Sequence, residues 1–263
     1  MLSVRKNNLL NNLFKKLKYK ADKRQRKEIK EMKCIGVIGA MEIEVEALKK
    51  NMNIEEIVDV ASMQFCKGTY GDVHVVIVRS GIGKVNAGMC TQILADRFHV
   101  DMVINTGIAG SLQAKIDIGD IVVSTDALQH DMDATGFGYA LGVIPQMETS
   151  VFQADEDLRK LAVNTCQRVN PDIHVYEGRV VSGDQFVSDQ DRKNAILKEF
   201  QGYCTEMEGA AIAQAAYLNQ IPFVIIRAIS DKADGSATMD YSEFEAKAVE
   251  HVVYLMDGML RSL

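Results

Sequence analysis

Short apolar runs alternate with segments of helical periodicity along most of the chain, and this alternation restricts the possible folds most. Cys34–Ile38 has the β-branched, apolar character of a buried strand. Glu44–Asn51 then places Val45 and Leu48 on one face of a helix. The pattern predicts further strands at 62–69, 73–79, 101–105, 121–124, 176–182 and 223–229, and helices at 84–98, 155–169, 208–219 and 241–260. This order predicts a three-layer α/β sandwich around a central mixed β-sheet.

Polar and glycine-rich segments follow several of these strands or open the helices between them. They are residues 39–44, 80–84, 105–110, 182–186, 205–208 and 227–231. Each has an ordinary structural interpretation when taken alone: Gly81 and Gly83 can permit a tight turn, and Ser230 with Asp231 can cap a helix. In open α/β sheets, however, ligands bind beyond the carboxyl ends of the strands. The segments together therefore predict one binding site at that edge.

Charge is distributed unevenly along the sequence. Residues 1–33 hold 12 of the 30 Lys and Arg and 3 of the 36 Asp and Glu, so the other 230 residues carry a net charge of −15. An acidic body repels nucleic acid and anionic membranes, which disfavours both as partners. No apolar run reaches the length of a membrane span. We expect a disordered basic extension at 1–32, with an amphipathic surface helix as the alternative, and a single domain at 33–263.

The five cysteines are odd in number and scattered, without a CxxC pair. This spacing is typical of reduced thiols in a cytoplasmic protein rather than of a disulfide framework or a zinc site. His130, Asp131 and Asp133 have the residue types of metal ligands, but no further ligand cluster accompanies them. We expect a solvated or interface loop there, and neither a metal nor a cofactor.

Several long motifs appear in a characteristic order: IGVIGAMEIEVEAL, SGIGKVNA, VSGDQF, TEMEGAAIA and VIIRAISDKAD. From about Lys33 to the C-terminus the chain resembles the nucleoside phosphorylase/nucleosidase superfamily, specifically its methylthioadenosine/S-adenosylhomocysteine nucleosidase family. The resemblance implies a nucleoside phosphorylase-like fold and a cytoplasmic homodimer without cofactor. It also implies the release of adenine by water from methylthioadenosine, S-adenosylhomocysteine and 5'-deoxyadenosine, in methionine salvage and in removal of an inhibitory methylation by-product.

Three other functions remain open. One is phosphorolysis on the same fold, for which Arg79 beside the SGIGK turn would be a phosphate ligand. Another is hydrolysis of a related adenine nucleoside such as aminofutalosine. The third is nucleoside binding without catalysis, which the presence of Glu44, Glu208 and Asp231 disfavours.

The resemblance assigns the chemistry to two carboxyl groups. Adenine is a poor leaving group as a nitrogen anion, so an acid must protonate its N7, and this role matches Asp231 with Ser230 beside it. A model aspartate is ionised at pH 7, so the pocket must favour its protonated form. Glu44 matches the base that activates water for attack on the opposite face of the sugar.

Further residues match the substrate contacts of the family. Glu208 would accept from two ribose hydroxyls, Met207 would pack on the sugar, and Arg227 would hold the water and ribose region or simply pair with Glu208. Phe186 would stack on adenine, unless it is plain core, while the backbone of Val187 reads the edge of the base.

The 5'-thio group would lie in an apolar pocket of Met41, Ile82 and Tyr241. A second subunit would contribute Phe137, Tyr139 and Pro145 across the dimer interface. The sequence departs from the family at two positions. Ile108 stands where many relatives have a serine, which removes a hydroxyl contact, and Tyr241 replaces a frequent phenylalanine.

Overall fold

The computed structural model describes residues 33–234 and 237–263, and for 238–243 it describes the backbone alone. Its strands are β1 (Cys34–Gly39), β2 (Asn53–Val60), β3 (Met63–Tyr70), β4 (Val73–Arg79), β5 (Met102–Ser111), β6 (Ile121–Gln129), β7 (Phe152–Gln153), β8 (Val175–Ser182), β9 (Cys204–Glu206) and β10 (Phe223–Asp231). Its helices are α2 (Glu42–Asn51), α3 (Lys84–Arg97), α4 (Glu156–Val169), α5 (Gln190–Phe200), α6 (Gly209–Leu218) and α7 (Ala237–Leu260), with a short 3-10 helix at Thr135–Phe137.

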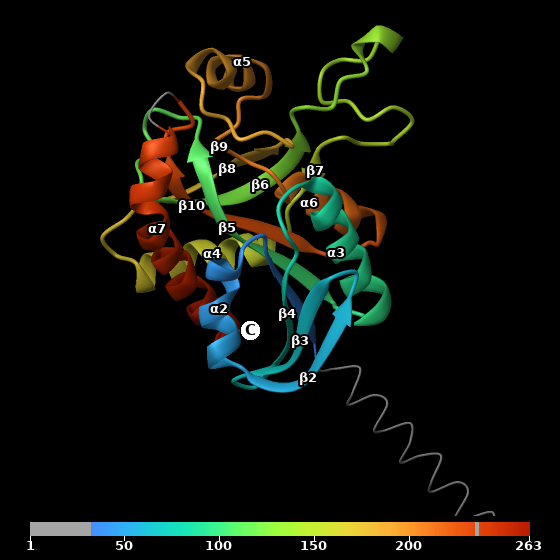
Figure 1. The fold of residues 1–263 in the computed structure, drawn as a ribbon, viewed down its shortest axis with the longest axis vertical. Coiled ribbons are helices and arrows are strands. Elements are labelled where there is room, and N and C mark those ends of the chain that lie inside the picture. Colours follow the sequence, from blue (N-terminus) through green and yellow to red (C-terminus); the bar gives the residue numbers. More distant parts are fainter. Residues whose placement is uncertain (1–32, 235–236) are drawn as a thin grey trace, which may run out of the picture. The chain divides into compact units, whose positions relative to one another are not determined.

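Helices cover both faces of the sheet, as Figure 1 shows. Alternate residues of a strand point to opposite faces, so Ile226 and Ala228 of β10 pack with α2, α4 and α7, whereas Ile225 and Ile229 pack with α3 and α6. The two apolar clusters are separated by the sheet itself. The three-layer α/β architecture with a central mixed sheet is therefore confirmed.

Part of the sheet closes on itself. The strands follow the order β10-β6-β8-β9-β5-β1-β4-β3-β2, and β10 also pairs with β5. The pairs β1–β4, β1–β5, β5–β10, β6–β8 and β8–β9 are parallel, while β2–β3, β3–β4, β6–β10, β5–β9 and β6–β7 are antiparallel. The strands β10, β6, β8, β9 and β5 thus form a ring. The strands β1, β4, β3 and β2 extend from β5 in that order.

The sequence pattern missed β2, β9, α5, the two-residue strand β7 and the 3-10 helix, and it shortened other elements. Strand β2 is mostly exposed and carries Glu55, Glu56 and Asp59, so it lacks a buried strand's apolar signal, although charges suit an edge strand. Helix α5 and strand β9 were also not predicted. Residues 105–110, expected to follow a strand, lie inside β5, because its second half pairs with β10 and β9.

The topology gathers several chain segments at one edge of the sheet. β1, β4, β8 and β10 are followed there by residues 40–44, 80–83, 183–187 and 232–234. Within the described residues 33–234 and 237–263, no helix combines the length and apolar character needed to cross a membrane. The gathered segments surround the cavity described next.

Candidate active site

A cavity of about 470 Å³ lies where these segments meet. It brings together eight of the residues predicted from the sequence: Met41, Glu44, Ile82, Phe186, Met207, Glu208, Ser230 and Asp231. The remaining lining residues are Ala40, Ile108, Ala109, Gly110, Thr205 and Glu206. The lining is apolar apart from four carboxyl groups and two hydroxyls, so the cavity suits an uncharged ligand with a few polar atoms.

Glu44 lies in the first turn of α2 and is only 2% exposed. One carboxylate oxygen accepts from the backbone N–H of Met41 at 2.9 Å, as the acid of a capping box does. The other accepts from the backbone N–H of Ile108 at 3.2 Å. Burial raises the pKa of Glu44, although Arg227 and these N–H groups oppose the rise. The carboxylate is therefore oriented from two sides and is more basic than an exposed glutamate.

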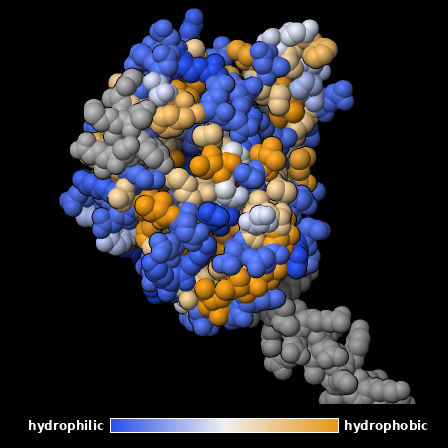
Figure 2. All heavy atoms as spheres, in the orientation of Figure 1, coloured by the Kyte–Doolittle hydropathy of each residue, from blue (hydrophilic) through white to orange (hydrophobic). Residues whose placement is uncertain are grey.

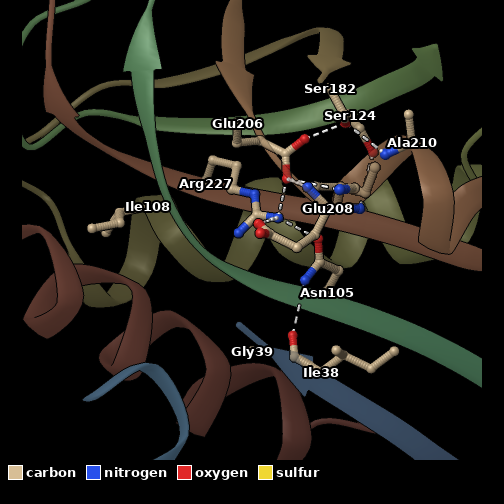
Figure 3. Close-up of polar contacts among 12 residues, drawn as sticks. Ile38, Gly39, Asn105, Ile108, Ser124, Ser182, Glu206, Glu208, Ala210 and Arg227 are labelled. Carbon is tan, nitrogen blue, oxygen red and sulfur yellow. Dashed lines mark hydrogen bonds and ion pairs between the residues drawn. The ribbon is translucent and has the colours of Figure 1, made fainter. Parts of the chain in front are cut away.

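Arg227 lies beneath the cavity rather than in its lining, and it is 1% exposed. Figure 3 shows its guanidinium between Glu206, Glu208 and Asn105. Its Nη2 donates to Asn105 Oδ1 at 2.5 Å, pairs closely with Glu206, and is 3.9 Å from Glu208 Oε2. Burial alone would lower the pKa of Arg227, but the neighbouring carboxylates raise it, so the group stays charged.

Gly107 makes room for the approach of Glu44 to Arg227. A Cβ on this glycine would lie 2.2 Å from Arg227 Nη1 and 2.5 Å from Glu44 Oε1. No side chain fits in that space. The Glu44 carboxylate and the Arg227 guanidinium thus meet over a residue of β5 that must be glycine.

Glu208 is the N-cap residue of α6 and is buried at the floor of the cavity. Its Oε1 accepts from the backbone N–H of Gly83 at 2.8 Å. Burial and the nearby Glu206 carboxylate raise the pKa of Glu208 to about 7, while Arg227 opposes the shift. Three carboxylates, those of Glu44, Glu206 and Glu208, therefore surround a single guanidinium.

Asp231 ends β10 and is 2% exposed. Its Oδ1 accepts from the backbone N–H of Ala233 at 2.8 Å, and its Oδ2 accepts from the hydroxyl of Ser230 at 2.8 Å. A Cβ on Gly110 of the neighbouring strand β5 would lie 2.7 Å from Asp231 Oδ1, so this position must be glycine for the carboxyl group to fit. The carboxyl group consequently has a fixed orientation at the cavity wall.

Four other predicted site residues do not line this cavity, and the side chain of a fifth is not described. Val187 is buried in the apolar cluster of α5, so only its backbone could serve a ligand. Phe137, Tyr139 and Pro145 lie in the 130–150 loop and do not line the cavity of their own chain. Phe137 is 87% exposed. The side chain of Tyr241 lies outside the described residues, although its backbone belongs to α7.

Glu206 is the main site residue that the sequence reasoning missed. It accepts from the hydroxyl of Ser182, from Arg227 and from the backbone N–H of Gly209 at 2.7 Å. Its position two residues before Glu208, at the end of a short strand, was the available signal. Thr205 and Ile108 also line the cavity. Ile108 contributes its backbone N–H to Glu44 and an apolar side chain to the wall.

His130, Asp131 and Asp133, the three residues with metal-ligand character, lie near one another but do not form a metal-binding group. Asp131 pairs with Lys84, Asp133 accepts from Thr135, and the His130 ring is buried beside Gly183. No cluster of three or more His, Cys, Asp or Glu side chains suited to a metal occurs among the residues that the structure describes.

Known proteins share this architecture. The sequence model of the Phosphorylase superfamily matches residues 34–261. A 5'-methylthioadenosine/S-adenosylhomocysteine nucleosidase of Exiguobacterium sp. is 42% identical over 211 residues, which cover 80% of this chain and 90% of the relative. The chain belongs to the 5'-methylthioadenosine/S-adenosylhomocysteine nucleosidase family.

Solved structures of this nucleosidase family superpose closely on the chain. The enzyme of Neisseria meningitidis, in complex with methylthio-immucillin-A, gives a TM-score of 0.84 at 38% identity, covering 88% of this chain and 100% of the other. A futalosine hydrolase of Helicobacter pylori gives a TM-score of 0.83 at 31% identity, covering 88% and 99%. The expected nucleosidase-family resemblance is thus confirmed, and the fold alone does not separate nucleosidases with different 5'-substituents.

Proposed function

We propose that the protein hydrolyses the N-glycosidic bond of 5'-methylthioadenosine and S-adenosylhomocysteine, and also of 5'-deoxyadenosine, and that it releases adenine in each case. The observation that carries this proposal is a cavity with buried carboxyl groups on two of its walls. Proteins similar to it in sequence are named for the first two substrates. Such an enzyme serves methionine salvage and removes an inhibitory by-product of methylation.

Asp231 is the proposed acid. Adenine leaves readily only when its N7 is protonated, and a positioned carboxylic acid contributes on the order of 10²–10⁴ in rate to such a step. The Ser230 hydroxyl and the Ala233 N–H hold the carboxyl group in place at the cavity wall. A purine that enters between Phe186 and this wall would present its edge to Asp231 and to the backbone of Val187.

Glu44 is the proposed base. It would remove a proton from a water molecule, which attacks the anomeric carbon as the bond to adenine breaks. Burial raises its pKa, and two backbone N–H groups orient its oxygens. A basic carboxylate in a fixed position is the requirement for this step.

The floor of the cavity favours the positive charge that develops on the sugar. Glu44, Glu206 and Glu208 place three carboxyl groups around the single positive charge of Arg227. Oriented charges of this kind stabilise an oxocarbenium-like transition state without reorganisation. Glu208 is placed to accept from ribose hydroxyls, with Met207 beside the ring and with Met41, Ile82 and Tyr241 toward the 5'-substituent.

The same charges oppose phosphorolysis. No Lys or Arg is among the described residues that line the cavity. Arg79, which could have bound phosphate, is 54% exposed and lies 3.8 Å from Glu42 at the surface. Like charges at ~4 Å repel by about 4 kcal/mol at an effective dielectric of 20, so a phosphate dianion beside Glu44 is strongly disfavoured.

Product analysis tests the proposal directly. Methylthioadenosine is incubated with the protein in phosphate-free buffer containing EDTA, and phosphate is then titrated in. We expect adenine and free methylthioribose at a rate independent of phosphate. Formation of methylthioribose 1-phosphate, with an absolute requirement for phosphate, would contradict hydrolysis.

Hydrolysis of aminofutalosine is a second candidate, because a futalosine hydrolase superposes almost as well as the nucleosidases. The apolar side chains of Met41 and Ile82 at the cavity wall favour the 5'-thioether that methylthioadenosine and S-adenosylhomocysteine share. Comparing kcat/KM for methylthioadenosine and aminofutalosine in the same assay decides between them.

A cytoplasmic homodimer is the proposed working form. Large apolar side chains are exposed around the cavity mouth and on the 130–150 loop, among them Ile82, Val85, Met89, Phe137, Tyr139 and Leu141. Figure 2 shows apolar residues in orange between hydrophilic ones on this face. Exposed apolar patches mark interfaces, and a second copy of the chain could insert Phe137, Tyr139 and Pro145 toward the 5'-end of the cavity. The five free cysteines suit a reducing compartment.

A further inference from the structure

Three charged residues lie between the two loops that form opposite walls of the cavity. Lys84 is the first residue of α3, Asp131 follows the end of β6 by two residues, and Asp184 follows the end of β8 by two residues. We call these three residues the clasp. None of them lines the cavity.

The clasp is a closed circuit of hydrogen bonds. Asp131 accepts from the Lys84 ammonium through Oδ1 at 2.5 Å and from the backbone N–H of Asp184 through Oδ2 at 2.9 Å. Asp184 Oδ1 in turn accepts from the backbone N–H of Lys84 at 2.8 Å. Each residue therefore contacts the other two, and Lys84 Nζ also donates to Gln129 at 2.9 Å.

The Lys84–Asp131 pair is largely shielded from solvent, whereas Asp184 is exposed. The side chains of Lys84 and Asp131 are 17% and 16% exposed, which distinguishes this ion pair from ordinary surface pairs. Burial alone would raise the pKa of Asp131, but the Lys84 ammonium and the Asp184 N–H lower it, so the carboxylate stays ionised. Loss of one partner leaves a charge poorly solvated, which costs more than the loss of an exposed pair.

Both ends of the clasp adjoin substrate-facing groups. Asp184 lies two residues before Phe186, at the wall proposed to stack on the base. Lys84 follows Gly83, whose N–H donates to Glu208, and lies two residues after Ile82 of the cavity wall. Gly83 has φ of +97°, and a Cβ there would lie 3.2 Å from Asp184 Oδ1, so the two loops meet where only glycine is comfortable.

We propose that Lys84, Asp131 and Asp184 are positioning residues that hold the Phe186 loop against the first turn of α3, so that the base-stacking wall and the hydrogen bond to Glu208 are set together. This inference rests on the proposed function, because it takes Phe186 as the wall beside adenine. The clasp acts on substrate binding through these two neighbours and takes no part in proton transfer.

Lys84→Met tests the proposal, because it removes the ammonium and keeps the backbone N–H that donates to Asp184. We expect the KM for methylthioadenosine and the Kd for adenine, by calorimetry, each to rise about tenfold, equivalent to about 1.4 kcal/mol. We expect kcat to stay within about threefold. Lys84→Arg, which keeps the charge, should recover most of the affinity.

Lys160→Met is the matched control. Lys160 pairs with Glu156 at 2.6 Å on α4, but the two side chains are 62% and 73% exposed and lie on the helix surface. This variant should leave KM and the adenine Kd unchanged. A general effect of removing a lysine would instead change both variants alike.

Asp131→Asn provides a more conservative second variant, because an amide oxygen still accepts from the Asp184 N–H. It should raise the adenine Kd in the same direction, and the double variant with Lys84→Met should be little worse than Lys84→Met alone, since coupled partners are not additive. Unchanged adenine affinity in both folded single variants would overturn the proposal, as would a loss confined to kcat. If the wild type releases no adenine from methylthioadenosine, the proposed function fails, while the adenine Kd series still decides the clasp.

Discussion

The floor of the cavity and a set of exposed apolar residues mostly outside it, which we call the rim, depart from the usual distribution of polar and apolar groups in opposite ways. The floor buries three carboxylates and a guanidinium in the protein interior: Glu44, Glu206, Glu208 and Arg227. The rim exposes large apolar side chains to solvent: Ile82, Val85, Met89, Phe137 and Tyr139. Each arrangement costs folding free energy, because charges prefer water and apolar surface avoids it.

The two costs are offset differently, and this difference distinguishes residues proposed for catalysis from residues proposed for dimer assembly. On the floor, the charges satisfy one another within a single chain through Arg227, Asn105 and backbone N–H groups. On the rim, no comparable internal partner covers Phe137, which is 87% exposed. We therefore expect substitutions on the floor to alter turnover and charge-dependent stability, and substitutions on the rim to alter association and substrate affinity.

The largest expected effect on turnover is at Asp231, which lies in the cavity wall and not in the floor. Asp231→Asn should lower kcat by about 10²–10⁴, since an amide cannot donate the required proton to N7. The amide oxygen can still accept from Ser230 or Ala233, so we expect the circular dichroism spectrum to be unchanged. Steady-state adenine release measures the effect, and a near-native kcat would remove Asp231 from the mechanism.

Glu44→Gln should cause a loss of kcat of about the same size, 10²–10⁴, because it removes the base. Because Glu44 lies on the floor, however, the variant should have a melting temperature equal to or above that of the wild type. It removes one negative charge from a buried group of three, and burial already disfavours the ionised form of Glu44 by raising its pKa. A clear loss of thermal stability would show that Glu44 stabilises the floor instead of straining it.

A pH series sharpens the same comparison. The folded state raises the pKa of Glu208 from 4.5 to about 7, so the native chain binds more protons than the unfolded chain between these values. The contribution of Glu208 to stability is therefore present below pH 4.5 and is lost as pH rises to about 7. Relative to Glu208→Gln, the wild type should lose on the order of 1–3 kcal/mol between pH 5 and pH 8. Urea unfolding at both pH values measures this, and parallel stability curves for the two proteins would refute it.

Phe137→Ala tests the rim. We expect the monomer fold to be unaffected, since this side chain lies in solvent, while the dimer dissociates more readily and the KM for methylthioadenosine rises roughly tenfold, as for a removed interface anchor. Light scattering across a dilution series and initial-rate kinetics report the two effects. If both dimerisation and KM are native, Phe137 belongs to neither the interface nor the neighbouring site.

Removal of residues 1–31 should have the smallest effect, because the described residues that line the cavity all lie at or beyond Ala40. We expect kcat/KM of a chain that begins at Met32 to lie within about twofold of the full chain, as for changes away from buried or special features. A large loss of activity or solubility would assign those residues a role in the body of the protein.

Much of the fold and site was predictable from local sequence. Apolar periodicity identified the main strands and helices, because burial of one face imposes a period of 2 or 3.6 residues. The motifs placed Glu44, Glu208 and Asp231 at the edges of these elements, and the structure brings the three into one cavity. The elements and the positions of these residues at their edges depend on neighbours in the chain, so the sequence by itself determined them.

Only the tertiary structure decided which distant groups meet. The closed ring of strands follows from the pairing of β10 with both β5 and β6, and no local pattern encodes that choice. The ring places Arg227 beneath the cavity, against Glu206. The sequence had instead suggested that Arg227 lies beside the ligand or pairs with Glu208. Asp131 and Lys84 likewise looked like a loop acid and a helix-initial lysine until the fold joined them. Such contacts join residues far apart in sequence, and only the register and closure of the sheet determine them.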